Sequence, residues 1–248
     1  MIQNSDKIYK KISLFAWRRI HLHIPTLDLR GKRVIDVGCW WGWFVRVARD
    51  QGADVNGFDC NWGQITDAVA FLQGNDGLCV ASAEEIPYKD ETFDVAFSYH
   101  VMEHVRSDSI MLREMNRVLV KSGILILAVP NDFSFSILPY YPLRWLLNHR
   151  AEYLKRHNRY DWLKSIVYSD MSHYREYTKK SLYTLLKANN FKTVLVKSYG
   201  FELPYPIKGR VQKNIRMLLN RFLGPITPPF FRSEFIVHAI KDANIRIQ

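Results

Sequence analysis

The chain has 248 residues, 48% of them hydrophobic, which is enough to bury the core of one α/β domain without disulfides or a structural metal ion. We find no run of about 18 uncharged apolar residues and no signal-peptide pattern at the N-terminus, so membrane spanning and secretion are not indicated and we expect a cytoplasmic protein. The net charge is +11, and the excess lies almost wholly in residues 131–232, which carry 18 Lys and Arg against 6 Asp and Glu.

From residue 33 onward, short apolar runs alternate with helical stretches, a pattern that predicts βαβ units and a parallel sheet. The predicted strands are Arg33–Val37, Asp54–Phe58, Leu78–Ala81, Asp94–Tyr99 and Gly123–Val129. The predicted helices between them are Trp41–Asp50, Gln64–Gln73 and Ser107–Val120, the last followed by the stop signal Lys121-Ser122-Gly123.

The alternation breaks beyond residue 130, where prolines and many Tyr, Trp and Arg residues replace the apolar runs. Regular structure resumes with a predicted helix over Thr178–Asn190 and strands over Lys192–Tyr199 and Glu234–Ile240. We predict one domain over residues 1–248, with an N-terminal helical cap at 1–30 and insertions at 132–172 and 201–231.

Three cysteines, Cys39, Cys60 and Cys79, each lie at or near a predicted strand end. They lack C-x-x-C spacing, which argues against a structural zinc site and a disulfide framework. We expect reduced thiols.

The strand Arg33–Val37 leads directly into a glycine turn with Asp36, Gly38 and Gly42. Glycine lets a backbone pass close to a ligand, and a carboxylate at the strand end can anchor a cationic or amide-bearing group. A glycine turn of this kind also occurs in nucleotide-binding Rossmann domains, and many are only turns.

Two further strand ends carry polar residues. Asp59 closes the second strand about 20 residues past the glycine turn, where a carboxylate can accept hydrogen bonds from both ribose hydroxyls. Ser82, Ala83 and Glu84 follow the third strand, where the next loop would flank an adenine. The three strand ends are expected to line one crevice.

Together these residues resemble the class I S-adenosylmethionine-dependent methyltransferases, in particular the small-molecule enzymes that include the ubiquinone-biosynthesis O-methyltransferases. Residues 36–42 are similar to the family's D-x-G-C-G-x-G, and residues 82–88 to the loop D-A-E-x-L-P. Residues 93–104 resemble F-D-x-V-x-S-x-x-V-x-E-H, and residues 113–123 resemble the R-E-x-x-R-x-L-x-x-G-G lead into the fifth strand. Residues 173–178 resemble the run H-x-R-x-x-T/S.

The resemblance implies a doubly wound α/β fold with a seven-stranded, mostly parallel sheet and an antiparallel last strand, and S-adenosylmethionine as the cofactor. The cofactor-binding residues that it implies are Asp36, Gly38, Cys39, Gly42, Asp59, Cys60, Ser82, Ala83, Glu84, Ser98, Tyr99 and His100. Two positions depart from the family pattern: Trp40 replaces its second glycine, and Ser82 replaces its aspartate.

Methyl transfer to a hydroxyl gains from a base that removes the acceptor's proton. The candidates by position are His100, Glu103, His104 and His173, with His100 and His173 placed first. Residues 100–104 also spell H-x-x-E-H, a metal-protease pattern. We disfavour a metal site because the pattern follows a buried strand inside a cofactor fold. The alternative interpretation of residues 100–104 is the start of a helix whose polar residues line a cleft.

We predict an S-adenosylmethionine-dependent methyltransferase that methylates an oxygen of a small acceptor or of a lipid- or glycan-linked one. Because the insertions are basic, we expect an anionic acceptor. The insertions would form the acceptor site or lid, and peripheral contact with a membrane stays open as a hypothesis. Two competing hypotheses are a non-catalytic binding protein on the same fold and an RNA or DNA methyltransferase that uses the basic insertions, although nucleic acid is the less favoured partner. An NAD-dependent dehydrogenase is disfavoured because G-x-G-x-x-G is absent. The oligomeric state is not predicted.

Overall fold

The structure is a computed structural model that describes Trp17, Ile20, His21, residues 24–131, Arg150, Arg175, residues 177–199 and residues 234–242. The chain divides into two compact units, with residues 1–128, 180–197 and 236–248 in the first and residues 129–179 and 198–235 in the second. Most of the predicted N-terminal cap, and the predicted insertions except Arg150, lie outside the described residues, so these domain assignments remain predictions. Within the described ranges, no helix is long and apolar enough to cross a membrane.

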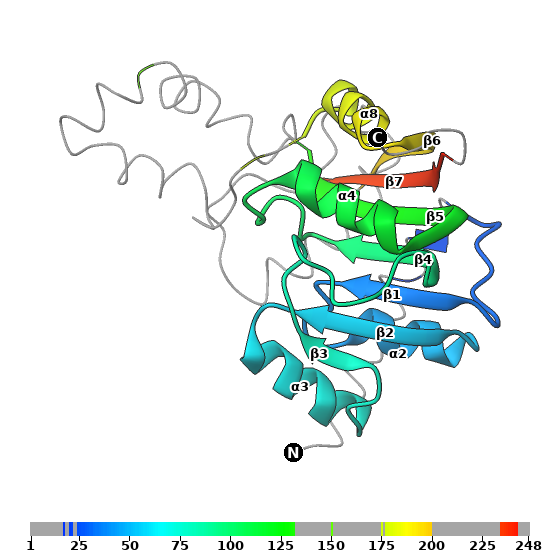
Figure 1. Ribbon diagram of the computed structural model, residues 1–248, viewed down its shortest axis with the longest axis vertical. Coiled ribbons are helices and arrows are strands. Elements are labelled where there is room, and N and C mark those ends of the chain that lie inside the picture. The colour runs from blue at the N-terminus through cyan, green and yellow to red at the C-terminus, as the bar shows by residue number, and fades with distance from the viewer. Residues whose placement is uncertain are drawn as a thin grey trace, which may run out of the picture. The chain divides into compact units, whose positions relative to one another are not determined.

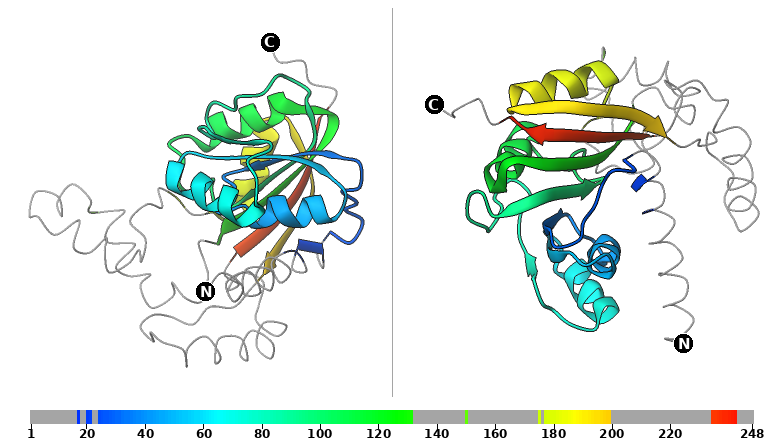
Figure 2. Two further views of the ribbon diagram at one scale, coloured as in Figure 1. Left: turned by 90° about the horizontal axis from the view of Figure 1, so that it is seen from below. Right: turned by 90° about the vertical axis from the view of Figure 1, so that its right-hand side faces the viewer.

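One seven-stranded sheet organises the fold, in the order β3-β2-β1-β4-β5-β7-β6 (Figure 1). The strands are β1 Arg33–Val37, β2 Asp54–Asp59, β3 Leu78–Val80, β4 Phe93–Tyr99, β5 Leu119–Pro130, β6 Phe191–Tyr199 and β7 Glu234–Lys241. β1 pairs in parallel with β2 and β4, β2 with β3, and β4 with β5. The arrow of β7 runs opposite to that of β6 (Figure 2). The predicted doubly wound, mostly parallel sheet with an antiparallel last strand is confirmed.

Four described helices accompany the sheet: α2 Trp43–Asp50, α3 Trp62–Leu72, α4 Asp108–Val118 and α8 Lys179–Ala188. α2 and α4 cover opposite faces of the sheet in both views of Figure 2. Phe44 of α2 is fully buried and stacks on Phe97 of β4, with ring centroids 3.6 Å apart. This aromatic stack helps to hold α2 against β4.

The order of the strands also indicates where in the sheet a ligand site is expected. After β1, the chain adds β2 and β3 on one side and then returns to place β4 on the other side of β1. Such a reversal separates the loops that follow β1 and β4, and ligands of doubly wound sheets bind at this point, outside the carboxyl ends of the strands.

The predicted end of the helix over residues 107–120 is wrong, because α4 ends at Val118 and Leu119 begins β5. Leu119 is extended (φ −75°, ψ 140°), fully buried and paired with Phe93 of β4. The register then shifts before Val95 pairs with Ile124, and Ser122 takes a φ of 60°. The predicted stop at residues 121–123 therefore lies inside the irregular start of a strand. The helical periodicity of residues 107–120 carries no information about the pairing of Leu119 with β4, so it could not predict where the helix ends.

Two helix starts also differ from their predicted positions. α2 begins at Trp43, two residues later than predicted, because Gly42 holds a left-handed conformation immediately before it. α3 begins at Trp62, two residues earlier than predicted. The Asn61 side chain caps it by accepting hydrogen bonds from the backbone amides of Gly63 (2.8 Å) and Gln64 (3.4 Å).

Candidate functional site

The glycine turn after β1 is fixed by its own packing. Gly38, Trp40 and Gly42 all have positive φ angles, of 75°, 49° and 79°. The backbone amides of Gly38 and Cys39 both donate to the Phe58 carbonyl of β2, at 2.9 and 2.8 Å. A Cβ atom at Gly38 would collide with the Val101 side chain. Glycine at position 38 is therefore required by the backbone and by the β4 loop, whether or not a ligand lies nearby.

Asp36 lies near the carboxyl end of β1 and is almost completely buried, with 2% of its surface exposed. Its carboxylate accepts no hydrogen bond from the described residues. Burial, and secondarily the charge of Asp59, raise the pKa of Asp36 well above its usual value. A buried carboxylate in this condition favours a cationic or hydrogen-bond-donating partner.

Asp59 ends β2 and organises the loops on either side of it. One carboxylate oxygen accepts the backbone amide of Trp40 at 3.1 Å, and the other accepts the amide of Asn61 at 2.9 Å. A carboxylate offers about four acceptor positions, so these two bonds leave about half of them for a ligand. The carboxylate is thus held in place while retaining acceptor capacity.

The loop after β3 uses its polar side chains within the protein. The Ser82 hydroxyl accepts the backbone amide of Glu84 at 3.1 Å. The Glu84 carboxylate accepts the amides of Ser107 (2.9 Å) and Arg106 (3.4 Å), just before α4. Ala83 is buried, with 8% exposed. The predicted cofactor contacts of these three residues remain predictions, and Glu84 also ties the β3 loop to the loop after β4.

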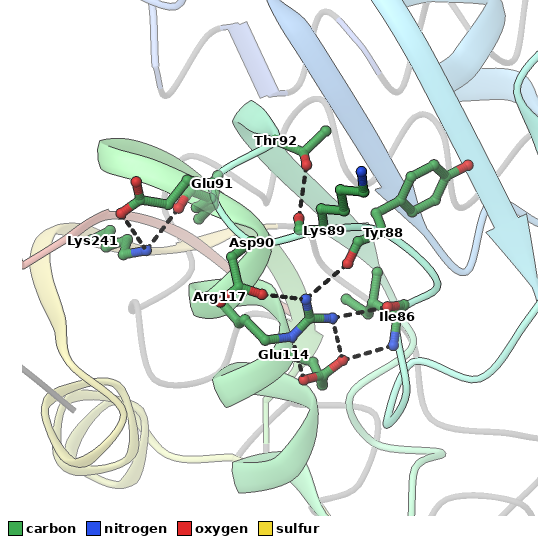
Figure 3. Close-up of polar contacts among 10 residues, drawn as sticks. Ile86, Tyr88, Lys89, Asp90, Glu91, Thr92, Glu114, Arg117 and Lys241 are labelled. Carbon is green, nitrogen blue, oxygen red and sulfur yellow. Dashed lines mark hydrogen bonds and ion pairs between the residues drawn. The ribbon is translucent and has the colours of Figure 1, made fainter. Parts of the chain in front are cut away.

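A second set of contacts holds the same loop against α4 (Figure 3). The Arg117 guanidinium donates to the carbonyls of Ile86 and Tyr88 and to the side chains of Asp90 and Glu114, all at 2.8–2.9 Å. Glu114 also accepts the Ile86 amide at 2.8 Å. Hydrogen bonds from Arg117 hold the pKa of Glu114 below its usual value. We call these contacts of Arg117 and Glu114 with residues 86–90 the clamp. The clamp was not predicted from the sequence, although the spacing of Glu114 and Arg117 on one helix would suggest an ion pair.

The loop after β4 brings two histidines to one buried carboxylate. Glu103 is completely buried, and its Oε1 lies 3.0 Å from His100 Nδ1 and 4.0 Å from His104 Nε2. Its Oε2 has no hydrogen-bond partner among the described residues. Both imidazoles are about one-third exposed, at 34%. A buried carboxylate behind a partly exposed imidazole is an arrangement suited to proton transfer.

The same loop corrects the helical interpretation of residues 100–104. Met102–His104 form a turn, His100 has a φ of 55°, and α4 begins only at Asp108. The two histidines are therefore not one helical turn apart on a helix, as the metal-protease pattern requires. No group of three metal-binding side chains occurs within the part of the chain that the structure describes.

The remaining predicted residues have varied surroundings. Ser98 is buried, and its hydroxyl donates to the Val37 carbonyl at 3.0 Å. The Tyr99 ring packs edge-on against Trp43, with centroids 5.6 Å apart. Cys39 is buried, and burial raises the pKa of its thiol, whereas Cys60 is exposed. His173 lies outside the described residues.

The electrostatics of the turn favour a cationic ligand over a phosphate. The amides of Gly38, Cys39 and Trp40 are all engaged by protein oxygens, so they are not available to a pyrophosphate as in dinucleotide-binding turns. The neighbouring charge of Asp59 contributes to the raised pKa of Asp36, so the two carboxylates already oppose each other. A further anion would add to this repulsion, whereas a cation would relieve it.

Residues 35–127 match the sequence model of a family described as "Methyltransferase domain". Two similar curated proteins are tRNA U34 carboxymethyltransferases. The one from Ectopseudomonas mendocina (strain ymp) is 36% identical over 118 residues, which are 46% of this chain and 36% of that protein. The one from Pseudomonas putida (strain W619) is 39% identical over the same length and the same shares. This chain thus spans little more than one-third of the length of these relatives.

Solved structures resemble the chain over most of its length. An S-adenosylmethionine-dependent methyltransferase from Mesorhizobium loti has a TM-score of 0.59 at 19% identity, covering 86% of this chain and 93% of that one. A SAM-dependent methyltransferase from Archaeoglobus fulgidus has a TM-score of 0.60 at 18% identity, covering 92% and 94%. Residues 35–127 are therefore similar to a methyltransferase-domain family, and the chain has the fold of solved S-adenosylmethionine-dependent methyltransferases.

Proposed function

We propose that this protein transfers a methyl group from S-adenosylmethionine to an oxygen of its acceptor. The observation that carries the proposal is the pair of carboxylates, Asp36 and Asp59, at adjacent carboxyl ends of β1 and β2 in a methyltransferase domain. Asp36 would hold the cationic methionine part and Asp59 the ribose hydroxyls. The cofactor, when bound, supplies a methyl group on a sulfonium, which is already activated for displacement.

The residues present fit such a ligand. Asp36 is buried and accepts no hydrogen bond within the described residues, so an ammonium or amide group of the ligand would satisfy it. Asp59 keeps acceptor positions beyond the two that bind Trp40 and Asn61. We also retain as proposed contacts the backbone of the glycine turn, Cys60, the Ser82–Glu84 loop and residues 98–100.

His100 is the proposed base for the acceptor hydroxyl. Its Nδ1 lies 3.0 Å from the buried Glu103 carboxylate, a contact that orients the ring. Nε2 would then be the nitrogen that accepts the proton. His104 is the second choice because it lies 4.0 Å from the same carboxylate oxygen. His173 stays a sequence-based candidate.

The proposed acceptor is an anionic small molecule or a lipid- or glycan-linked one. Its support is the charge distribution: residues 131–232 carry 18 Lys and Arg against 6 Asp and Glu. Positive charge concentrated in one segment attracts anionic partners and steers their approach.

A tRNA acceptor is the second candidate, favoured by the names of the curated relatives. The identity to these relatives covers 46% of this chain and 36% of each relative, so the acceptor named for them is carried over only as a proposal. The same basic segment would suit the phosphates of RNA. Steep weakening of RNA binding with salt would distinguish this candidate from a small-molecule enzyme.

Two measurements test the proposal. Calorimetric titration with S-adenosylmethionine and NAD in parallel should show binding of the first alone. Transfer of labelled methyl groups to fractionated cell extract, with and without ribonuclease, should then label a fraction that survives ribonuclease if the acceptor is not RNA. Cofactor binding with no transfer to any fraction would instead favour a non-catalytic binding protein.

A further inference from the structure

Trp40 has an unfavourable backbone conformation for its residue type. Its φ of 49° lies in the left-handed region, where a side chain at Cβ crowds the backbone. The other non-glycine residues with positive φ in the described ranges are all polar: Gln73, Glu91, His100, Ser122 and Asn190. A glycine at position 40 would adopt the same conformation without this strain, so the indole carries a conformational cost in the free protein.

The indole is also poorly buried. Trp40 is 53% exposed, and its one ring partner among the described residues is Trp41, with centroids 5.9 Å apart. Packing within the described fold therefore gives little reason for a large aromatic side chain here. Backbone strain of this kind clusters at ligand-binding sites, so it motivates a functional role for the exposed indole.

The backbone of Trp40 is fixed beside the proposed ribose-binding carboxylate. Its amide donates to Asp59 Oδ2 at 3.1 Å, so the residue is held at the carboxyl ends of β1 and β2. A flat indole offers a surface on which a purine or the face of a ribose can stack.

We infer that Trp40 is a contact residue for the adenosine half of the bound cofactor, with its indole covering the nucleoside whose ribose Asp59 holds. This inference rests on the proposed function. It assigns a specificity role to a side chain where glycine would be the unstrained choice, and it predicts that the loss of the indole weakens binding without destabilising the protein.

The test measures binding of S-adenosylhomocysteine by calorimetry and thermal midpoints in parallel. Trp40→Gly should bind on the order of tenfold more weakly, the effect of losing one stacking contact, while its thermal midpoint is unchanged or higher. Trp40→Phe, which keeps an aromatic face, should stay within about threefold of the unaltered protein. The matched control is Gln73→Gly, which relieves a φ of 59° at the end of α3 and should leave the affinity unchanged.

Fluorescence gives a second readout that does not depend on the glycine variant. Ligand binding should change the indole emission of the unaltered protein, and most of that change should be absent in Trp40→Phe. An equal emission change in Trp40→Phe, or unchanged affinity in Trp40→Gly, overturns the inference.

Asp59→Ala separates this failure from failure of the proposed function. If Asp59→Ala loses affinity while Trp40→Gly does not, the cofactor site stands and Trp40 is not part of it. If the unaltered protein binds no S-adenosylhomocysteine, the proposed function itself is wrong.

Discussion

At the scale of single residues, the buried charge of Asp36 lowers the free energy of unfolding. Burial and the charge of Asp59 raise its pKa above the unfolded value of 3.8. The free energy of unfolding is therefore unaffected at pH values below about 4 and falls as the pH rises towards the folded pKa. A charge that folding buries in this way is tolerated where a ligand uses it.

We predict that Asp36→Asn, which keeps the shape and removes the charge, raises the free energy of unfolding at pH 7 by roughly 1 kcal/mol. The gain should vanish below about pH 4, where the aspartate is protonated in both states. Urea unfolding at the two pH values checks this. A less stable variant at pH 7 would show that the charged form of Asp36 is satisfied within the protein.

A second prediction at this scale concerns the tautomer of His100. The Glu103 carboxylate 3.0 Å from Nδ1 should hold the proton of the neutral ring on that nitrogen. Nitrogen NMR of the histidine rings should show Nδ1–H in the unaltered protein and in Glu103→Gln, whose carbonyl can still accept. In Glu103→Leu the proton should move largely to Nε2. A proton on Nε2 in the unaltered protein would contradict the proposed role of Glu103.

At the scale of elements, the N-cap of α3 connects helix stability to the site. Asn61 caps the helix with its side chain, and its backbone amide binds Asp59. Asn61→Ala should lower the free energy of unfolding by about 1 kcal/mol, whereas Asn61→Asp should retain most of it. Chemical denaturation measures both variants. Equal stability of Asn61→Ala and the unaltered protein would mean that water replaces the cap without loss.

The clamp between α4 and the β3 loop gives another prediction. Arg117→Lys keeps the charge but loses the fork that reaches Ile86, Tyr88, Asp90 and Glu114, so it should cost about 1–3 kcal/mol of stability. Because the pKa of Glu114 is depressed, the stability from this contact is present above about pH 4.5 and is lost as the pH falls. Arg30→Lys is the control, since its ion pair with Asp28 is exposed, and it should leave the unfolding midpoint unchanged. Similar midpoints for the two variants would contradict the clamp.

The elements also show where sequence patterns suffice. The apolar runs that become β1 and β4 predict buried parallel strands correctly, because both faces of a doubly wound sheet are covered. The start of β5 at Leu119 is set by its pairing with Phe93, a contact between segments that local periodicity does not encode. The observed starts of α2 and α3 differ by two residues from the predicted ones, because the left-handed Gly42 determines the start of α2 and the Asn61 cap determines the start of α3.

At the scale of the whole molecule, the edge of the sheet at which a candidate residue lies can be predicted from the sequence when the strand order determines it. Asp36 and Asp59 lie at the ends of neighbouring parallel strands, so a correct strand order brings them to the same edge of the sheet. Side-chain orientation is a different matter. The carboxylate of Glu84 binds the amides before α4, and Glu103 is completely buried between two histidines, which only tertiary packing determines.

The proposed function depends above all on Asp36 and Asp59 together holding an adenosyl sulfonium ligand. Calorimetric titration of S-adenosylhomocysteine into the unaltered protein, Asp36→Asn and Asp59→Asn tests this most directly. We predict saturable binding to the unaltered protein and at least about tenfold weaker binding to each variant, as expected when a charged acceptor of a ligand hydrogen bond is lost. Absence of binding to the unaltered protein, or equal affinity in all three, would contradict the proposed role of the two carboxylates.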